Sequence, residues 1–204
     1  MFEAILFDCD GVLFDSLKAN LAFYSSVLNA LGAPAIDPTD AARVELCHTA
    51  SSRVVFDTLL GPQKGKEALA LAAQMTFDGF IGSMEPQPGL MSALGRLADQ
   101  LPLGVATNRG ASIHAIVRHF ELSHLFRSVV CCLDVAQPKP APDMVLLAAQ
   151  QLGCSPRALL FVGDSELDRQ AALAAGATFA AFRTSVKGDY ALSSFDELVA
   201  LFSV

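Results

Sequence analysis

Short apolar runs alternate with helix-like repeats along most of this chain. The first run, Ala4–Phe7, is too short for a helix and ends at a charged turn, so we interpret it as a strand buried on both faces. Comparable runs occur at 103–107, 129–133, 159–162 and 178–182. Because helical spacing separates these runs, we expect right-handed crossovers between parallel strands. The predicted fold class is α/β, a doubly wound parallel sheet with helices on both faces.

The predicted helices between these strands carry apolar residues three or four positions apart. They cover residues 90–101, 113–120, 144–152 and 171–175. A last helix begins at Ser194, and Glu197 stands three residues later. This spacing predicts a capping box, in which each of the two side chains accepts a hydrogen bond from the other residue's backbone N–H.

Residues 16–88 follow a different pattern. Helical periodicity fills this segment, with breaks at 49–52 and at Gly61-Pro62, and no strand-like alternation interrupts it. We interpret 16–88 as an all-helical cap inserted after the first strand and joined by two crossings that can hinge. Residues 1–15 and 89–204 would then form the α/β core. Alternatively, the same helices pack against the sheet as a fixed layer.

Charge and composition narrow the classes of partner. The net charge is −7 and the Lys and Arg residues are scattered singly, so no basic stripe is present that could follow a nucleic-acid backbone. An anionic substrate must therefore be attracted by a local basic residue or a bound metal ion. No stretch suits a membrane span, and the N-terminus does not resemble a secretory signal. We expect a soluble cytoplasmic protein, monomeric or homodimeric.

The cysteines and histidines do not indicate a metal or disulfide framework. The five cysteines lack CxxC spacing, and Cys131 and Cys132 are adjacent in a predicted strand, where a disulfide between them has poor geometry. A reducing compartment fits this usage. Cys9 lies between two carboxylates that would suppress its thiolate, so a nucleophilic role is not expected. Three of the four histidines are five residues apart and do not share a helix face, which argues against a zinc cluster.

Polar residues stand where several predicted strands end. Asp8 and Asp10 follow the first strand, Thr107 ends the second, Asp164 follows another, and Lys139 lies in a loop just past a further strand. Because the carboxyl ends of parallel strands meet at one edge of the sheet, we expect these side chains to converge. Two carboxylates so close to a buried strand repel each other unless a cation compensates them. The Asp-x-Asp-Gly sequence alone is equally compatible with a solvated turn.

Four segments together resemble the motifs of the haloacid dehalogenase-like hydrolases. Residues 8–16, Asp-Cys-Asp-Gly-Val-Leu-Phe-Asp-Ser, resemble the first motif of the branch with two aspartates, which handles phosphate esters. The others are 105–109, 137–143 and 161–168, in the family's order and at suitable spacing. Haloacid dehalogenases lack the second aspartate and phosphonatases replace it, so Asp10 argues against both. The last three motifs look closest to the phosphoglycolate phosphatase-like subgroup, which has a helical cap.

The resemblance implies a Mg²⁺-dependent phosphatase that hydrolyses a small phosphorylated metabolite through an aspartyl phosphate on Asp8. Asp10 would act as general acid and base for the leaving group and for the hydrolytic water. Lys139 would place a positive charge beside the nucleophile. The hydroxyl of Thr107 and the side-chain amide of Asn108 would bind phosphate oxygens.

The resemblance also implies a set of metal ligands. Asp8, the main-chain carbonyl of Asp10 and Asp164 would hold Mg²⁺, which prefers such hard oxygen donors. Asp168, one helical turn after Asp164, would help to hold the metal or the lysine. In the cap, four residues could contact the part of the substrate that is not transferred: His48, Arg53, Lys64 and Lys66.

Two other functions remain open. One is a phosphomutase of the β-phosphoglucomutase type, which would use the same aspartyl phosphate, and Ser52-Arg53 faintly resembles a cap motif of that group. The other is a non-catalytic receiver domain, in which an aspartate near a lysine is phosphorylated. Receivers are smaller, lack a helical insertion and carry the acidic pair on a different strand from the phosphorylated aspartate. Product analysis with a phosphosugar separates phosphatase from mutase.

Overall fold

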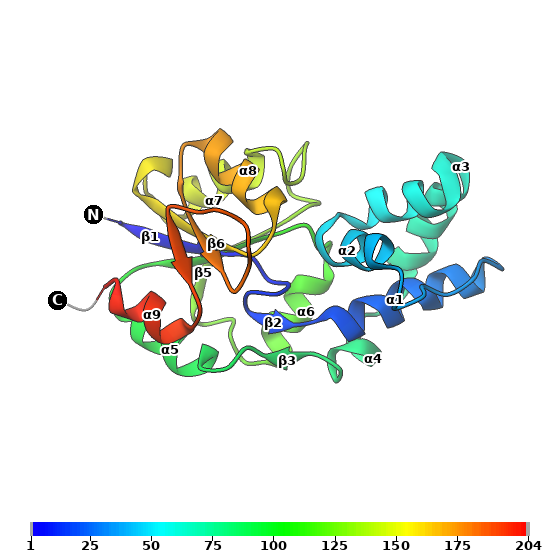
Figure 1. Cartoon of the computed structure of the whole chain (residues 1–204), viewed down its shortest axis with the longest axis horizontal. Coiled ribbons are helices and arrows are strands. Elements are labelled where there is room, and N and C mark those ends of the chain that lie inside the picture. Colours follow the sequence, from blue (N-terminus) through cyan, green and yellow to red (C-terminus); the bar gives the residue numbers. More distant parts are fainter. Residues whose placement is uncertain (1, 203–204) are drawn as a thin grey trace.

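The computed structural model describes residues 2–202 and has an α/β architecture (Figure 1). Its main sheet has the strand order β5-β4-β1-β6-β7-β8, and all neighbouring strands in it run parallel. The strands are β1 (Ala4–Phe7), β4 (Leu103–Thr107), β5 (Phe126–Cys131), β6 (Leu159–Gly163), β7 (Thr178–Phe182) and β8 (Tyr190–Leu192). The predicted doubly wound fold is confirmed.

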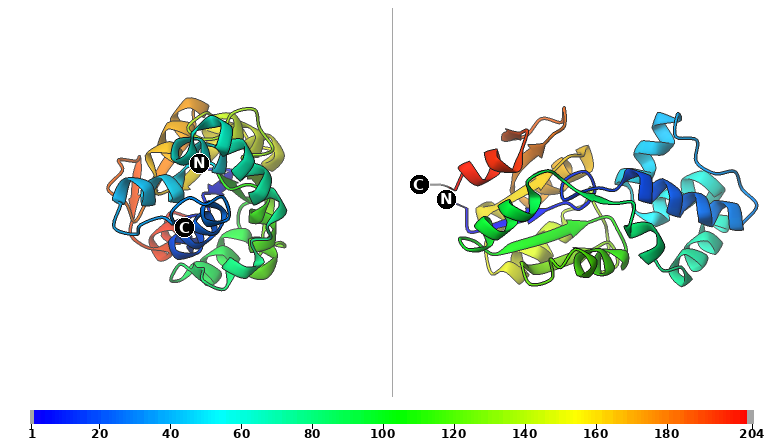
Figure 2. Two further views of the ribbon diagram at one scale, coloured as in Figure 1. Left: turned by 90° about the vertical axis from the view of Figure 1, so that its right-hand side faces the viewer. Right: turned by 90° about the horizontal axis from the view of Figure 1, so that it is seen from below.

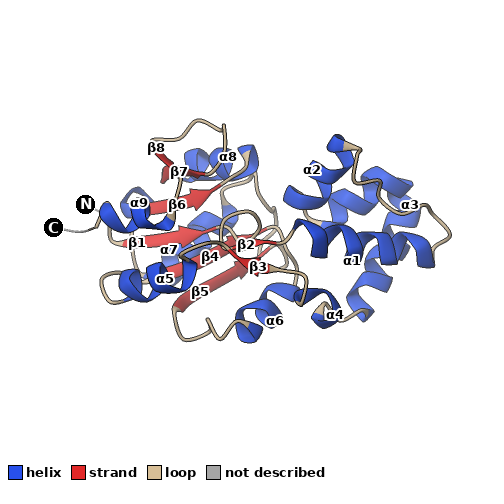
Figure 3. Cartoon of the chain, turned by 60° about the horizontal axis from the view of Figure 1, so that its bottom comes forward, coloured by secondary structure: helices blue, strands red, loops and turns tan. Residues whose placement is uncertain are grey.

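Side chains of β1 point alternately into two apolar layers, as the two-residue period of a strand requires. Ile5 and Phe7 pack into one layer, and Ala4 and Leu6 into the other. The first layer is covered by α5 (Leu90–Ala98), α6 (Ser112–His119) and α9 (Phe195–Ala200), and the second by α7 (Asp143–Leu152) and α8 (Glu166–Ala175). Figure 3 shows the sheet between these helices, with the arrows of β1, β4, β5 and β6 pointing toward the same end of the molecule.

A group of four helices lies beyond that end of the sheet (Figure 2, right). These helices are α1 (Leu17–Ala30), α2 (Ala41–Thr49), α3 (Ser52–Gln74) and α4 (Asp78–Ile81). The breaks predicted at 49–52 and Gly61-Pro62 are present, the second as a non-helical Gly61 with φ 79° inside α3. No helix in residues 2–202 is both long and apolar enough to cross a membrane.

The helical group has its own apolar cluster but also shares the main core. Tyr24 and Phe56 are buried within the group, whereas Phe77 and Ile81 pack with the residues under α5 and α6. The two chain crossings pair with each other as a short antiparallel ladder, β2 (Phe14–Asp15) with β3 (Glu85–Pro86). This ladder was not predicted, because two residues carry no detectable period. The assignment of 16–88 to a cap stays a prediction.

Several elements differ from the predicted ones, some of them for identifiable reasons. β5 ends at Cys131 rather than at Leu133, because the Asp134 carboxylate accepts the Cys131 N–H at 2.8 Å and turns the chain, which leaves Leu133 70% exposed. α8 begins five residues before its apolar repeat, at a capping box described below. β8 and a 3-10 helix at Pro156–Ala158 are too short for a pattern to reveal.

The last helix begins as predicted, with half of the predicted capping box. The Ser194 hydroxyl accepts a hydrogen bond from the Glu197 N–H at 3.3 Å. The Glu197 carboxylate, however, accepts from the N–H of Ser193 at 2.7 Å instead of that of Ser194. The reciprocal contact is thus displaced by one residue, which satisfies a backbone donor just before the helix.

Candidate active site

The strand order places the motif residues next to one another. β1 lies between β4 and β6, so Asp8 after β1, Thr107 at the end of β4 and Asp164 after β6 share one edge of the sheet. Asp8, Thr107 and Lys139 line a cavity of about 770 Å³, whose opposite wall comes from α1, α2 and α3. A site between the sheet edge and the helical group follows directly from the topology.

Lys139 is held in the centre of this edge by three oxygen atoms. Its Nζ donates to Asp8 Oδ1 at 2.7 Å, to Asp168 Oδ1 at 2.5 Å and to the carbonyl of Ala106 at 3.0 Å. The Lys139 side chain is only 3% exposed. Burial opposes its charge, but the carboxylates of Asp168 and Asp8 raise the pKa of the ammonium above its usual value. Lys139 therefore stays charged beside Asp8.

The start of α8 aims Asp168 at this lysine. Asp168 Oδ2 accepts from the Ser165 hydroxyl at 2.6 Å and from the Ser165 N–H at 3.1 Å, and Ser165 Oγ accepts from the Asp168 N–H. Gly163 permits this approach, since a Cβ there would lie 2.5 Å from Asp168 Cβ. A capping box thus fixes the carboxylate that fixes Lys139. Of the two contacts implied for Asp168, the structure shows the one to the lysine.

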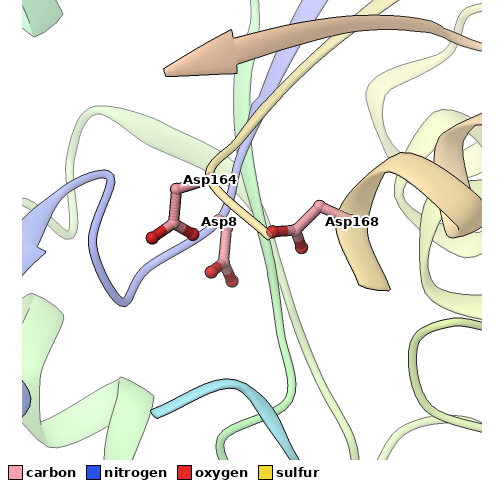
Figure 4. A group of neighbouring side chains, drawn as sticks. All are labelled: Asp8, Asp164 and Asp168. Carbon is pink, nitrogen blue, oxygen red and sulfur yellow. The ribbon is translucent and has the colours of Figure 1, made fainter. Parts of the chain in front are cut away.

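Asp8, Asp164 and Asp168 form a compact acidic group (Figure 4). One oxygen of each lies within 4.8 Å of the others. Burial raises the pKa of Asp8 to about 7, although Lys139 opposes the shift. Burial and the neighbouring Asp8 raise the pKa of Asp164 to about 9. Carboxylates that are so difficult to ionise together are those that a divalent cation would stabilise.

The donor set of this group fits a hard cation. Asp8 and Asp164 supply carboxylate oxygens, which Mg²⁺ prefers. Both oxygens of Asp168 are occupied by Lys139 and Ser165, which suits a supporting position better than direct coordination. The lack of a side chain at Gly11 leaves room for the Asp164 carboxylate in this group. A Cβ at Gly11, which has φ 77°, would lie 2.0 Å from Asp164 Oδ2.

Asp10 is bound by a cluster that the sequence analysis did not identify. Arg109 Nε donates to Asp10 Oδ2 at 2.8 Å and Nη2 to Oδ1 at 2.5 Å, while Asn20 Nδ2 donates to Oδ1 at 3.0 Å. The Ser16 hydroxyl also donates to Oδ1. Burial alone would raise the pKa of Asp10, but Arg109, assisted by His48 and Ser16, lowers it to about 2.

A signal for this cluster was present in the motif itself. Arg109 directly follows Thr107-Asn108 at the end of a fully buried strand, and an arginine in such a place needs a carboxylate partner. Which carboxylate it meets depends on the tertiary structure, because Asp10 lies 99 residues earlier. The motif match therefore named Arg109 without assigning it a contact.

Asn108 makes contacts other than those that the resemblance implies. Its amide Nδ2 donates to the carbonyl oxygens of Thr49 and Lys139, at 3.0 and 3.1 Å. The first bond ties the end of β4 to the end of α2, and the second ties it to the loop that carries Lys139. The Thr107 hydroxyl oxygen accepts from the Arg109 N–H at 3.2 Å, which leaves its own O–H free to donate. Phosphate binding by Thr107 and Asn108 stays a prediction.

Other candidate residues separate into those near the site and those away from it. His48 and Arg53 line the cavity, and His48 Nε2 lies 3.9 Å from Asp164 Oδ2. Lys64 and Lys66 are absent from the described lining. Burial, followed by the charge of Asp10, raises the pKa of Cys9 above its usual value, so this thiol stays protonated.

Known sequences that are similar to this chain are hydrolases and phosphatases. The family model for "Haloacid dehalogenase-like hydrolase" matches residues 5–182. Phosphoglycolate phosphatase of Escherichia coli O157:H7 is 30% identical over 197 residues, which covers 85% of this chain and 78% of that protein. Fructose-1-phosphate phosphatase of Escherichia coli K12 is 28% identical over 179 residues, covering 86% and 93% of the two proteins.

Solved structures of similar fold include a member of the same superfamily. A HAD-superfamily hydrolase of subfamily IA, variant 1, from Geobacter sulfurreducens PCA superposes with a TM-score of 0.87 at 33% identity and covers 98% of this chain and 100% of that one. CbbY from Rhodobacter sphaeroides, solved in complex with phosphate, gives a TM-score of 0.82 at 25% identity, with 97% and 96% of the chains covered.

Proposed function

The chain belongs to the haloacid dehalogenase-like hydrolase family, in its phosphoglycolate phosphatase-like branch, and we propose that it hydrolyses phosphate monoesters of small metabolites. The observation that carries the proposal is the buried contact of 2.7 Å between Asp8 and Lys139 beside Asp164. It supplies a carboxylate nucleophile, a fixed positive charge and a second carboxylate for a cation at one point. Two relatives are named as phosphatases of small phosphate esters, phosphoglycolate and fructose 1-phosphate, which supports the proposed phosphatase function.

The proposed reaction has two steps. A carboxylate oxygen of Asp8 attacks phosphorus, the ester P–O bond breaks, and Asp10 gives a proton to the departing alkoxide. Water then attacks the aspartyl phosphate, Asp10 takes a proton from that water, and inorganic phosphate leaves. Lys139 holds Asp8 in place in both steps. Mg²⁺ held by Asp8, Asp164 and the Asp10 carbonyl would neutralise negative charge on the nucleophile and the phosphoryl oxygens.

Arg109 defines what Asp10 needs for this role. With a pKa of about 2, Asp10 is a carboxylate in the described arrangement, which suits its task as base. Its task as acid requires a proton, and therefore an arrangement in which the two bonds from Arg109 are loosened. Asp10 would thus act as base while both bonds from Arg109 are formed, and as acid while they are loosened.

Product analysis tests the proposal. With Mg²⁺, the protein should release inorganic phosphate from p-nitrophenyl phosphate and from phosphosugars. Formation of an isomeric phosphosugar without release of phosphate would instead establish the phosphomutase alternative. Failure to process any ester with Mg²⁺ present would reject both.

Removal of divalent cations is expected to stop hydrolysis. EDTA should lower the rate by a factor on the order of 10² or more, and added Mg²⁺ should restore it. Asp164→Asn should raise the Mg²⁺ concentration needed for half-maximal rate, because it removes a charged ligand. Asp196→Asn, on an exposed residue of α9, is the matched control and should leave the Mg²⁺ requirement unchanged. Full activity in EDTA would contradict the proposed metal site.

Gly11→Ala is expected to lower kcat/KM by about 10²-fold, the loss that a displacement of about 1 Å in a reacting group can cause. The new Cβ would collide with Asp164 Oδ2, so Asp164 must move. Gly32→Ala is the matched control, since Gly32 also has positive φ, 71°, but nothing within 4 Å. Both variants should lose stability in thermal unfolding because both glycines have positive φ, and only Gly11→Ala should lose activity. Equal activity of the two would show that the glycine is needed for its backbone alone.

A further inference from the structure

The cavity beside the catalytic edge is larger than a phosphoryl group needs. Its volume of about 770 Å³ lies in the range that encloses ligands of drug size. The phosphoryl group would lie at one side of this space, where Asp8 and Lys139 contact each other. The rest of the cavity is therefore available to the alcohol part of an ester, and its walls decide which alcohols fit.

Much of the wall opposite the catalytic edge is apolar. Four half-buried apolar residues of α1 and α3 line the cavity there: Phe23, Leu69, Ala72 and Met75. The ring of Phe23 is held by its neighbours, because its centroid lies 5.5 Å from that of Tyr24 and 5.4 Å from that of Phe77. This part of the wall is thus a preformed apolar surface that remains partly accessible to water.

Leu133 adds an apolar surface from the sheet side. It lines the same cavity and is 70% exposed. Its side chain lies over Gly110, where a Cβ would be 3.6 Å from Leu133 Cδ1. The turn that carries Leu133 is fixed, because the Cys131 N–H donates to the Asp134 carboxylate at 2.8 Å and the Asp134 N–H to the Cys131 carbonyl at 3.1 Å.

This leucine differs from the single exposed apolar residues that are ordinary on protein surfaces. A hydrogen-bonded turn holds it beside a cavity whose opposite wall is already apolar. Apolar surface that gathers in a concave site marks a place for an apolar ligand. Leu133 and the wall formed by α1 and α3 therefore belong to one binding surface.

The charges of the catalytic edge do not favour a polar alcohol over an apolar one. Asp8 is paired with Lys139 at 2.7 Å, and Asp10 with Arg109 at 2.5 Å. Because each charge already has its partner, little is left to attract a charged group on the alcohol part. An apolar alcohol part would instead remove half-buried apolar surface from water, which is favourable in proportion to the area covered.

We propose that the space between Leu133 and the apolar wall of α1 and α3 is a subsite for an apolar alcohol part of the substrate. The inference rests on the proposed phosphatase function and narrows its substrate class to phosphate monoesters of apolar alcohols. In this role Leu133 determines specificity, and it recognises the alcohol through buried area rather than through hydrogen bonds.

The test uses a series of primary alkyl phosphates, from ethyl to hexyl phosphate, with Mg²⁺ present. Their leaving alkoxides have similar basicity, so the intrinsic reactivity stays nearly constant while the apolar area grows. Each fully buried methylene should raise kcat/KM about fourfold, and each half-buried one about twofold. Wild-type kcat/KM should therefore be about 16-fold to 250-fold higher for hexyl than for ethyl phosphate, which is shorter by four methylenes.

Three variants locate this dependence on chain length. Leu133→Gln places a polar amide in the subsite and should weaken the dependence, and Met75→Gln should weaken it from the opposite wall. Leu173→Gln is the matched control. Leu173 is 54% exposed on α8 and is absent from the described lining of the cavity, so this variant should keep the wild-type dependence.

Equal wild-type kcat/KM for all chain lengths would overturn the subsite. A dependence that persists in Leu133→Gln, or is lost in Leu173→Gln, would overturn its assignment to Leu133, and persistence in Met75→Gln would exclude the wall of α3. If Leu133→Gln lowered kcat/KM for all esters by one factor, Leu133 would position the helical group instead of the alcohol.

Hydrolysis of p-nitrophenyl phosphate by the wild type reports the proposed function separately. If this ester is hydrolysed and kcat/KM does not change with chain length, only the subsite fails. If no ester is hydrolysed, the proposed function fails. Should circular dichroism show that a variant is unfolded, the wild-type series still decides, because it requires no substitution.

Discussion

Asp8→Asn should abolish hydrolysis of p-nitrophenyl phosphate, lowering kcat by a factor on the order of 10⁴ or more. The amide oxygen of asparagine carries no charge and cannot form the acyl phosphate. The fold should remain intact, because the two side chains have the same shape and the substitution removes one of several buried carboxylates that raise one another's pKa. Steady-state kinetics and thermal unfolding measure the two expectations on the same sample.

Asp15→Asn is the matched control for this variant. Asp15 is an exposed residue of β2, seven positions along the same motif, and its substitution should leave kcat within about twofold of wild type. If folded Asp8→Asn kept a kcat close to that of Asp15→Asn, Asp8 would not be the nucleophile. If both variants lost activity equally, the loss would reflect the motif loop as a whole.

Lys139→Met should reduce both activity and stability. It removes the cation between Asp8 and Asp168 while both carboxylates stay buried, which typically costs roughly 3–5 kcal/mol of unfolding free energy. The rate of hydrolysis should fall by a factor on the order of 10³ or more, because the nucleophile loses the group that holds it. Chemical denaturation measures the first effect and steady-state kinetics under native conditions the second.

The combination distinguishes a working lysine from a merely structural one. Lys187→Met, on an exposed residue, provides the background for loss of a lysine at the surface and should change neither quantity measurably. A Lys139→Met protein that is less stable but hydrolyses phosphate at the wild-type rate would remove Lys139 from the reaction. Unchanged stability would mean that the two carboxylates find another partner.

The parts of the fold that could be predicted from sequence are those with a long apolar signal. The run Ala4–Phe7 contains only apolar residues, and its length and the charged turn that follows favour a strand buried on both faces over a helix. Three-residue β8 has two exposed residues and carries no such signal. The start of α8 depended on Ser165 and Asp168, whose capping contacts precede the apolar repeat by several residues.

For the candidate site, placement was predictable and side-chain partners were not. The order of parallel strands forces Asp8 and Asp164 to one edge, so their proximity followed from the topology. The Asp10–Arg109 pair depends on side chains that approach from loops 99 residues apart. No periodicity encodes such a contact, and only burial of both groups in the folded chain reveals it.

The ladder between β2 and β3 has a mechanical consequence. The two chain segments that connect the sheet with α1–α4 are paired through this ladder. The segment that returns to the sheet is also hydrogen-bonded to the Gly11 turn, because the Gln87 side chain donates to the Gly11 carbonyl at 3.1 Å. Two paired segments allow bending at the ladder more easily than rotation about it. We therefore expect any displacement of α1–α4 relative to the sheet to bend the chain at this ladder and to shift the Gly11 turn, which lies next to Asp164. Opening of the cavity and weakening of the cation site would then occur together.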